Sequence, residues 1–95
     1  MLYKRFDVMK SFKAAPHAAW RRVEDEIVIL DLNTSLYYSL NEVGARVWEL
    51  CDGDRSVADI TGVLAAEYEA PDDVILRDVV DLLTALRAER LVAVD

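Results

Sequence analysis

The chain has 95 residues, 54% of them hydrophobic and 31% charged, which suits one small globular domain and excludes a disordered segment. Its 11 basic and 18 acidic residues give a net charge of −7, which argues against a general nucleic-acid binder, because such proteins neutralise phosphates with Lys and Arg. One cysteine, Cys51, and one histidine, His17, predict no internal disulfide, no metal site and no cofactor.

The charge is unevenly distributed along the chain. Residues 1–15 are basic overall, whereas residues 16–95 hold seven arginines against seventeen acids. We therefore expect an N-terminal arm at 1–15 that is flexible or exchanged between chains, followed by a domain at 16–95 whose core begins near Pro16. No apolar run approaches the roughly 20 residues of a membrane span, so a cytoplasmic location is expected.

Three strands follow the arm, at 18–23, 27–32 and 36–40. Polar turns at 24–26 and 33–35 separate them, and turns this short predict an antiparallel meander. The nearly continuous β-branched run of the second strand predicts burial on both of its faces. In the third strand, alternation places Leu36, Tyr38 and Leu40 on one face and Tyr37 and Ser39 on the other.

The hydrophobic period then becomes helical. Asn41 is a suitable N-cap for a first helix that ends at 51–54, where Gly53 fits a left-handed backbone position. Ser56 caps a second helix, and Asp59 completes a capping box with it. A third helix begins after Pro71 and runs to about Arg90, and the β-branched tail at 91–94 adds a strand or packs on the sheet. The sequence thus predicts an α+β domain in which three strands precede three helices.

No catalytic constellation emerges from the sequence. Cys51 ends an amphipathic helix and fits a small buried hydrophobic residue, and His17 has no nucleophile near it in sequence. The acid pairs 72–73 and 78/81 fit a helix start and a solvated helix face. The chain is therefore expected not to be an enzyme.

Two features exceed what packing requires. Residues 35–40 contain neither charge nor proline, the usual protection of an edge strand. The apolar arc of the third helix is wider than one core-facing stripe. Together they predict a groove for an extended peptide, lined by ten residues: Ser35, Leu36, Tyr37, Tyr38, Ser39, Leu40, Leu76, Val80, Leu83 and Arg87. The alternatives are that another segment covers the edge, or that the helix face is a dimer interface or lies under the arm.

The stretch from residue 20 to residue 94 resembles the coenzyme PQQ synthesis protein D family. The most specific part is the run of Leu40, Asn41, Val43, Gly44 and Ala45, followed by an Asp-Gly turn at 52–53. Further support comes from residues 20–23, 25–28, 38–50, 56–60, 78–79, 82–83 and 90–92.

The resemblance implies a winged-helix-like domain that acts as a RiPP recognition element, a domain that captures the leader of a ribosomally made precursor peptide. It further implies that the leader adds as a strand to the third strand, against the third helix, and is presented to a radical enzyme, protease or cyclase of PQQ-type or other RiPP biosynthesis. Two other functions stay open: a winged-helix DNA-binding regulator, which the acidic third helix opposes, and a structural subunit that forms a homodimer.

Overall fold

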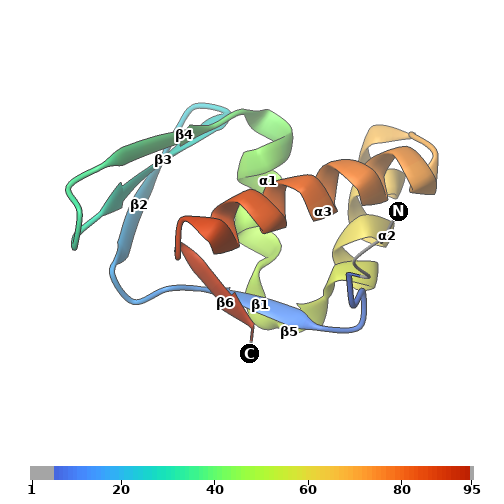
Figure 1. Ribbon diagram of the computed structural model, residues 1–95. Coiled ribbons are helices and arrows are strands. Elements are labelled where there is room, and N and C mark those ends of the chain that lie inside the picture. Colours follow the sequence, from blue (N-terminus) through green and yellow to red (C-terminus); the bar gives the residue numbers. More distant parts are fainter. Residues whose placement is uncertain (1–5, 95) are drawn as a thin grey trace, which may run out of the picture.

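The computed structural model describes residues 6–94 and confirms the α+β class (Figure 1). In chain order its elements are β1 (Ser11–Ala14), β2 (Ala18–Val23), β3 (Glu26–Asp31), β4 (Tyr37–Leu40), α1 (Glu42–Leu50), β5 (Asp52–Ser56), α2 (Val57–Tyr68), α3 (Asp72–Ala88) and β6 (Val92–Val94). The strands form two antiparallel three-stranded sheets, ordered β2-β3-β4 and β5-β1-β6. No helix of the described part is long and apolar enough to cross a membrane.

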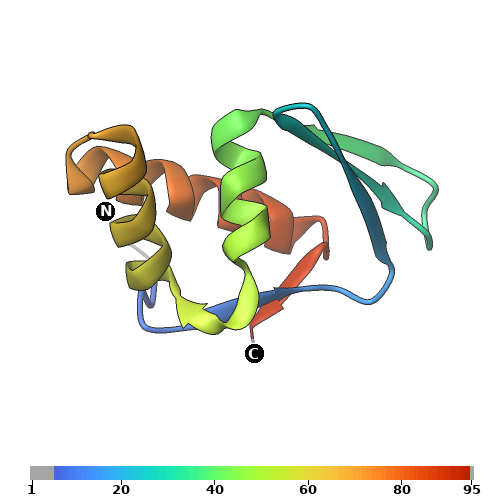
Figure 2. The ribbon, with the colours of Figure 1, turned by 180° about the vertical axis from the view of Figure 1, so that it is seen from behind.

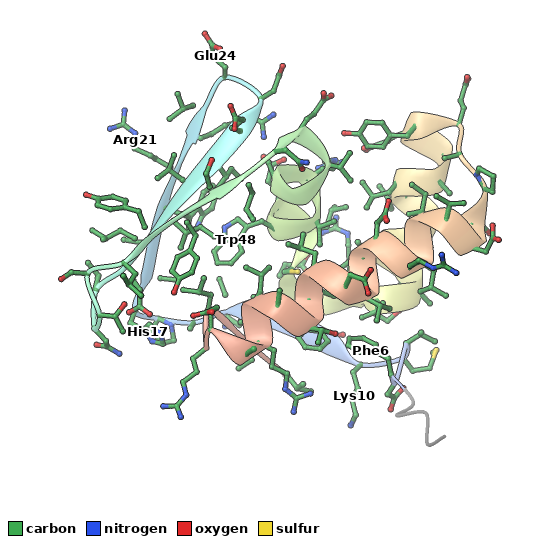
Figure 3. The ribbon with its side chains drawn as sticks, turned by 45° about the horizontal axis from the view of Figure 1, so that its top comes forward. Phe6, Lys10, His17, Arg21, Glu24 and Trp48 are labelled. Carbon is green, nitrogen blue, oxygen red and sulfur yellow. The ribbon has the colours of Figure 1, made fainter. Side chains whose placement is uncertain are left out.

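The sheet β2-β3-β4 is the predicted meander, but only one of its faces packs against the helices. On the inner face, Ile27 and Ile29 of β3 are buried and pair with Leu40 and Tyr38 of β4. The other face stays partly open: Arg21 points away from the helices (Figure 3), and β3 alternates buried and half-buried residues. The expectation that β3 is buried on both faces is therefore wrong, since the helices all lie on one side of this sheet (Figures 1 and 2).

The second sheet incorporates the end of the predicted N-terminal arm. β1 is its central strand, and Phe12 in β1 is only 2% exposed. Just before β1, the carbonyl oxygens of Val8 and Lys10 accept hydrogen bonds from the first amides of α2, which have no partners within the helix. The prediction that the core begins near Pro16 is therefore wrong, because residues 8–14 are part of the packed domain. The first five residues of the predicted arm lie outside the described residues.

The strand β5 was not expected, because its sequence is polar and reads as a helix-ending turn. The side chain of Asp52 accepts hydrogen bonds from the amides of Asp54 and Arg55, and Gly53 has φ 86°, the left-handed conformation predicted for it. Pairing with β1 makes this turn a strand. The order of three strands followed by three helices therefore needs correction: β5 lies between α1 and α2, and β1 precedes the meander.

Local signals placed the helix starts correctly. The side chain of Asn41 accepts a hydrogen bond from the amide of Gly44 at 2.9 Å, and Ser56 and Asp59 form a complete capping box. α3 buries Ile75, Val79, Leu83 and Leu86 in the shared core. Cys51 is buried in that core as expected, and burial raises the pKa of its thiol to about 12.

Candidate functional site

β4 is an edge strand with an unguarded free side. Among the described residues it pairs only with β3, and it contains no charge and no proline. The opposite edge strand, β2, carries Arg21 and Arg22. β4 and α3 lie on the same side of the molecule, and β2 lies on the other (Figures 1 and 2). The edge able to accept another strand is therefore the one beside α3.

A groove of about 490 Å³ separates β4 from α3. We call it the β4–α3 groove; its lining residues are Ser39, Leu40, Asn41, Val43, Gly44, Val47, Asp78, Asp81 and Leu82. Its lining comes from the last two residues of β4, from α1 and its cap, and from the middle of α3. The groove combines aliphatic side chains with two carboxylates and a strand edge, so it offers an extended peptide backbone partners and apolar contacts.

A hydrogen bond connects β4 to the C-terminal end of α3. The phenol of Tyr38 donates to a carboxylate oxygen of Glu89, which caps α3, at 3.0 Å. This bond raises the pKa of the Tyr38 phenol, because the carboxylate favours the protonated form. Tyr38 shares the inner face of the sheet with Ile29, so its ring extends toward the helices.

The predicted peptide-contacting segment 35–40 divides into a turn and a strand. The carboxylate of Asp31 accepts hydrogen bonds from the amides of Asn33 and Thr34. Burial opposes its ionisation, but these bonds prevail and lower the pKa of Asp31. Ser35 has φ 65°, and the Leu36 carbonyl accepts from the Asp31 amide, which closes the hairpin. Ser35 and Leu36 are therefore turn residues, and only residues 37–40 form the extended edge.

Two of the four predicted α3 residues line a different groove. Val80 and Arg87 belong to a hollow of about 740 Å³ on the opposite flank of α3, which we call the N-terminal groove. Its other lining residues are Phe6, Asp7, Lys10, Phe12, Thr84, Ala88 and Val94. Figure 3 shows Phe6 and Lys10 below α3, away from the sheet that contains β4. These two side chains therefore do not share a groove with β4.

The remaining predicted α3 residues also lie away from β4. Leu83 is fully buried in the core, and Leu76 is half-buried against that core without lining the β4–α3 groove. The apolar arc of α3 extends past the core on both flanks, with Val80 at one margin and Leu82 at the other. The sequence prediction chose the Val80 margin and did not include Leu82, which is the margin residue that shares a groove with β4.

The described residues 6–94 contain no group of three or more His, Cys, Asp or Glu side chains placed to hold a metal ion. The strongly perturbed group among them is Cys51, and its raised pKa makes it a poor nucleophile. The feature that stands out among the described residues is instead the free edge of β4 beside the β4–α3 groove.

Comparisons with known proteins identify the family of the chain. The family model of coenzyme PQQ synthesis protein D matches residues 26–92. A PqqA binding protein of Bradyrhizobium diazoefficiens is 37% identical over 70 residues, which cover 74% of this chain and 68% of that protein. The structure of TbiB1 in complex with the TbiA(beta) leader peptide has a TM-score of 0.78 and 31% identity, and the match covers 84% of this chain and 93% of that chain.

A third similar structure supports the fold alone. It is the PqqD truncation of Methylobacterium extorquens PqqCD, described as a functional and stand-alone RiPP recognition element. It has a TM-score of 0.78 and 22% identity, and the match covers 94% of this chain and 95% of that chain.

Proposed function

The chain belongs to the coenzyme PQQ synthesis protein D (PqqD) family, and we propose that it is a non-catalytic domain that captures the leader of a ribosomally made precursor peptide. Family membership supports the proposal, because a relative at 37% identity is named for binding PqqA and a relative at 31% identity is bound to a leader peptide. The observation that carries the proposal is the uncharged free edge of β4 beside the β4–α3 groove.

The binding mode follows from the edge. About half of the backbone groups of β4 (Tyr37–Leu40) point away from β3, so an added strand forms roughly four hydrogen bonds, each worth about 0.5–1.5 kcal/mol net. Alternate side chains of that strand then point into the groove and contact Leu82 and Leu40. Backbone pairing supplies affinity that is independent of sequence, and the groove selects the leader.

This mode revises the set of peptide-contacting residues. We assign the strand addition to residues 37–40, with Ser35 and Leu36 at its turn end, and the groove contacts to Leu82, Asp78 and Asp81. Val80 and Arg87 lie on the other flank of α3 and Leu83 is buried, so these three are assigned no direct contact with the leader, and neither is Leu76.

The bound leader is presented to a modifying enzyme. Membership of a family named for coenzyme PQQ synthesis supports this association. A radical enzyme, a protease and a cyclase are the candidate classes. Presentation requires that the enzyme and the leader bind at once, and the open outer face of the sheet β2-β3-β4, which holds Tyr37 at 71% exposure, leaves room for a second contact while the groove is filled.

The test is an NMR titration of the isotope-labelled chain with the precursor leader encoded beside its gene. Large amide shift changes are expected at residues 35–40 and 78–82, and a scrambled leader of the same composition should cause none. Changes concentrated at residues 6–12 and 84–94 would move the site to the N-terminal groove and refute this assignment. A dimer mass in solution that the leader does not dissociate would favour the structural-subunit function, with β4 paired to β4 of a second copy.

A further inference from the structure

The β4–α3 groove has one sign of charge. Among residues 6–94, Asp78 and Asp81 are the only ionisable residues that line it, and none of the Lys or Arg residues in that range does so. Both carboxylates are exposed, and neither forms an ion pair or a side-chain hydrogen bond with any residue in the range 6–94. By contrast, the N-terminal groove on the other flank contains Lys10 and Arg87. The two flanks of α3 therefore differ in charge, and the one beside β4 is negative.

The spacing of the groove residues on α3 matches the repeat of an added strand. Asp78 lies one turn before Asp81 and Leu82, so these side chains follow each other at about 5–6 Å along one flank of the helix. In a strand, residues i and i+2 lie on one face about 6.6 Å apart. In a leader paired with β4, one inward side chain therefore reaches Asp78, and the next inward side chain reaches Asp81 and Leu82.

The surroundings of Leu82 differ from those of the two carboxylates. Leu82 is half-buried, and a Cβ on Gly44 would lie 3.5 Å from the Leu82 side chain, 3.4 Å from that of Leu40 and 3.3 Å from the side-chain oxygen of Asn41, so this part of the groove is narrow and mainly aliphatic. The Asp78 and Asp81 carboxylates project at the solvent-facing margin of α3. An apolar stem that carries a cation at its end satisfies both environments, because Lys and Arg bury their methylene groups while the charged head stays in water.

We propose that the groove selects leaders with Lys or Arg at an inward-facing position, and with an aliphatic or aromatic residue two positions away. The inference rests on the proposed function, since it names the class of peptide that the same site takes. A leader with Glu or Asp at that inward position is rejected, because its carboxylate would lie beside two others without a cation to pair with. Charge here acts on the choice of partner more than on total affinity.

The effect of Asp78 and Asp81 on peptide affinity is limited because both carboxylates are exposed to solvent. A pair between exposed groups changes affinity by about 1.5- to 5-fold, and two such pairs by up to about 25-fold. Replacement of Lys by Glu in the peptide converts attraction into repulsion, so the ratio between the two peptides exceeds that between Lys and Gln. Higher ionic strength reduces all of these ratios, because the carboxylates are reached by solvent.

The experiment is a selection from a library of random displayed decapeptides. One arm uses the full wild-type chain and a second uses Asp78→Asn/Asp81→Asn. The matched control is Asp72→Asn/Asp73→Asn, which removes the same two charges from the start of the same helix, outside the groove. Because the chain has a net charge of −7, this control separates selection by the groove from general attraction of basic peptides.

Peptides enriched on the wild type and on the control should share Lys or Arg at one position and an apolar residue two positions away. Enrichment of the basic residue should fall by at least threefold on Asp78→Asn/Asp81→Asn. Synthetic versions with Lys, Gln or Glu at that position should then bind in that order, with about a tenfold range that narrows in 0.5 M salt.

Two negative results are distinguishable. Peptides that perturb amides of β4 but show no basic preference, or an equal preference on both double variants, overturn the charge selection and leave strand addition intact. Enriched peptides that perturb only amides outside β4 and α3, or an absence of any enriched peptide, contradict the proposed function together with this inference.

Discussion

Two matched truncations on α3 decide which flank of the helix contacts the leader. Leu82 and Val80 are both half-buried and both pack against the core, but Leu82 lines the β4–α3 groove and Val80 lines the N-terminal groove. We expect Leu82→Ala to weaken leader binding and Val80→Ala to leave it unchanged. The sequence alone predicts the reverse, since it placed Val80 in the peptide groove.

The magnitude follows from the area that remains exposed. Full burial of a Leu side chain is worth about 1.5–3 kcal/mol. Leu82 is already half-buried in the free domain, so about 1 kcal/mol is left for contact with a leader, and its loss should raise Kd by about fivefold. Each truncation should also cost about 1–2 kcal/mol of unfolding free energy, less than the roughly 2–5 kcal/mol of a fully buried site.

Isothermal titration calorimetry with the gene-adjacent precursor leader measures the two affinities, and urea unfolding measures the two stabilities. If the two variants lose similar amounts of stability, the difference between their affinities reports on which flank of α3 the leader contacts. If Val80→Ala raises Kd by more than twofold while Leu82→Ala does not, the leader occupies the N-terminal groove and the reasoning from the edge of β4 fails.

Three further predictions concern the fold. Phe12→Ala should lower the free energy of unfolding, measured in urea, by about 3–5 kcal/mol, whereas Met9→Ala should change it by no more than about 0.5 kcal/mol, because Met9 is 73% exposed. Equally small losses for the two variants would show that the arm is not part of the packed domain. Ser56→Ala removes one bond of the α2 capping box and should cost about 1 kcal/mol, and no loss would show that the cap is not needed. Cys51 should resist a thiol reagent at pH 8 until urea unfolds the chain, because burial disfavours its thiolate. For the same reason, stability should begin to fall as pH rises above about 9, and Cys51→Ala should remove the part of the fall that begins there, leaving the part due to Tyr38 and Tyr68, whose pKa values are also raised; rapid labelling of the folded protein would contradict both predictions for Cys51.

The sequence by itself determined the features that depend on near neighbours. The caps at Asn41 and Ser56 were predictable because each side chain bonds to an amide three residues on. The meander was predictable because its turns are short and polar and apolar residues alternate along its strands. That β4 is an unprotected edge strand was also predictable, because it contains neither charge nor proline. The resemblance to the PqqD family could also be recognised from the sequence at Leu40 to Ala45.

Long-range pairing decided the strands that the sequence did not reveal. β5 is polar and reads as a turn, and β1 lies in a stretch with the composition of a loose terminus. Each becomes a strand because the other supplies its hydrogen-bonding partners, and their separation in sequence hides this from any local pattern.

The site depended on tertiary structure in a more specific way. A helical period fixes the angles between side chains on α3, but it does not fix which flank of the helix turns toward the sheet. That orientation is set by burial of the central stripe, which includes Val79 and Leu83, against α1, α2 and the two sheets. Once the stripe is buried, Leu82 and the two carboxylates face β4 while Val80 faces β1 and β6, because the two margins of one apolar arc must lie on opposite sides of the core they share.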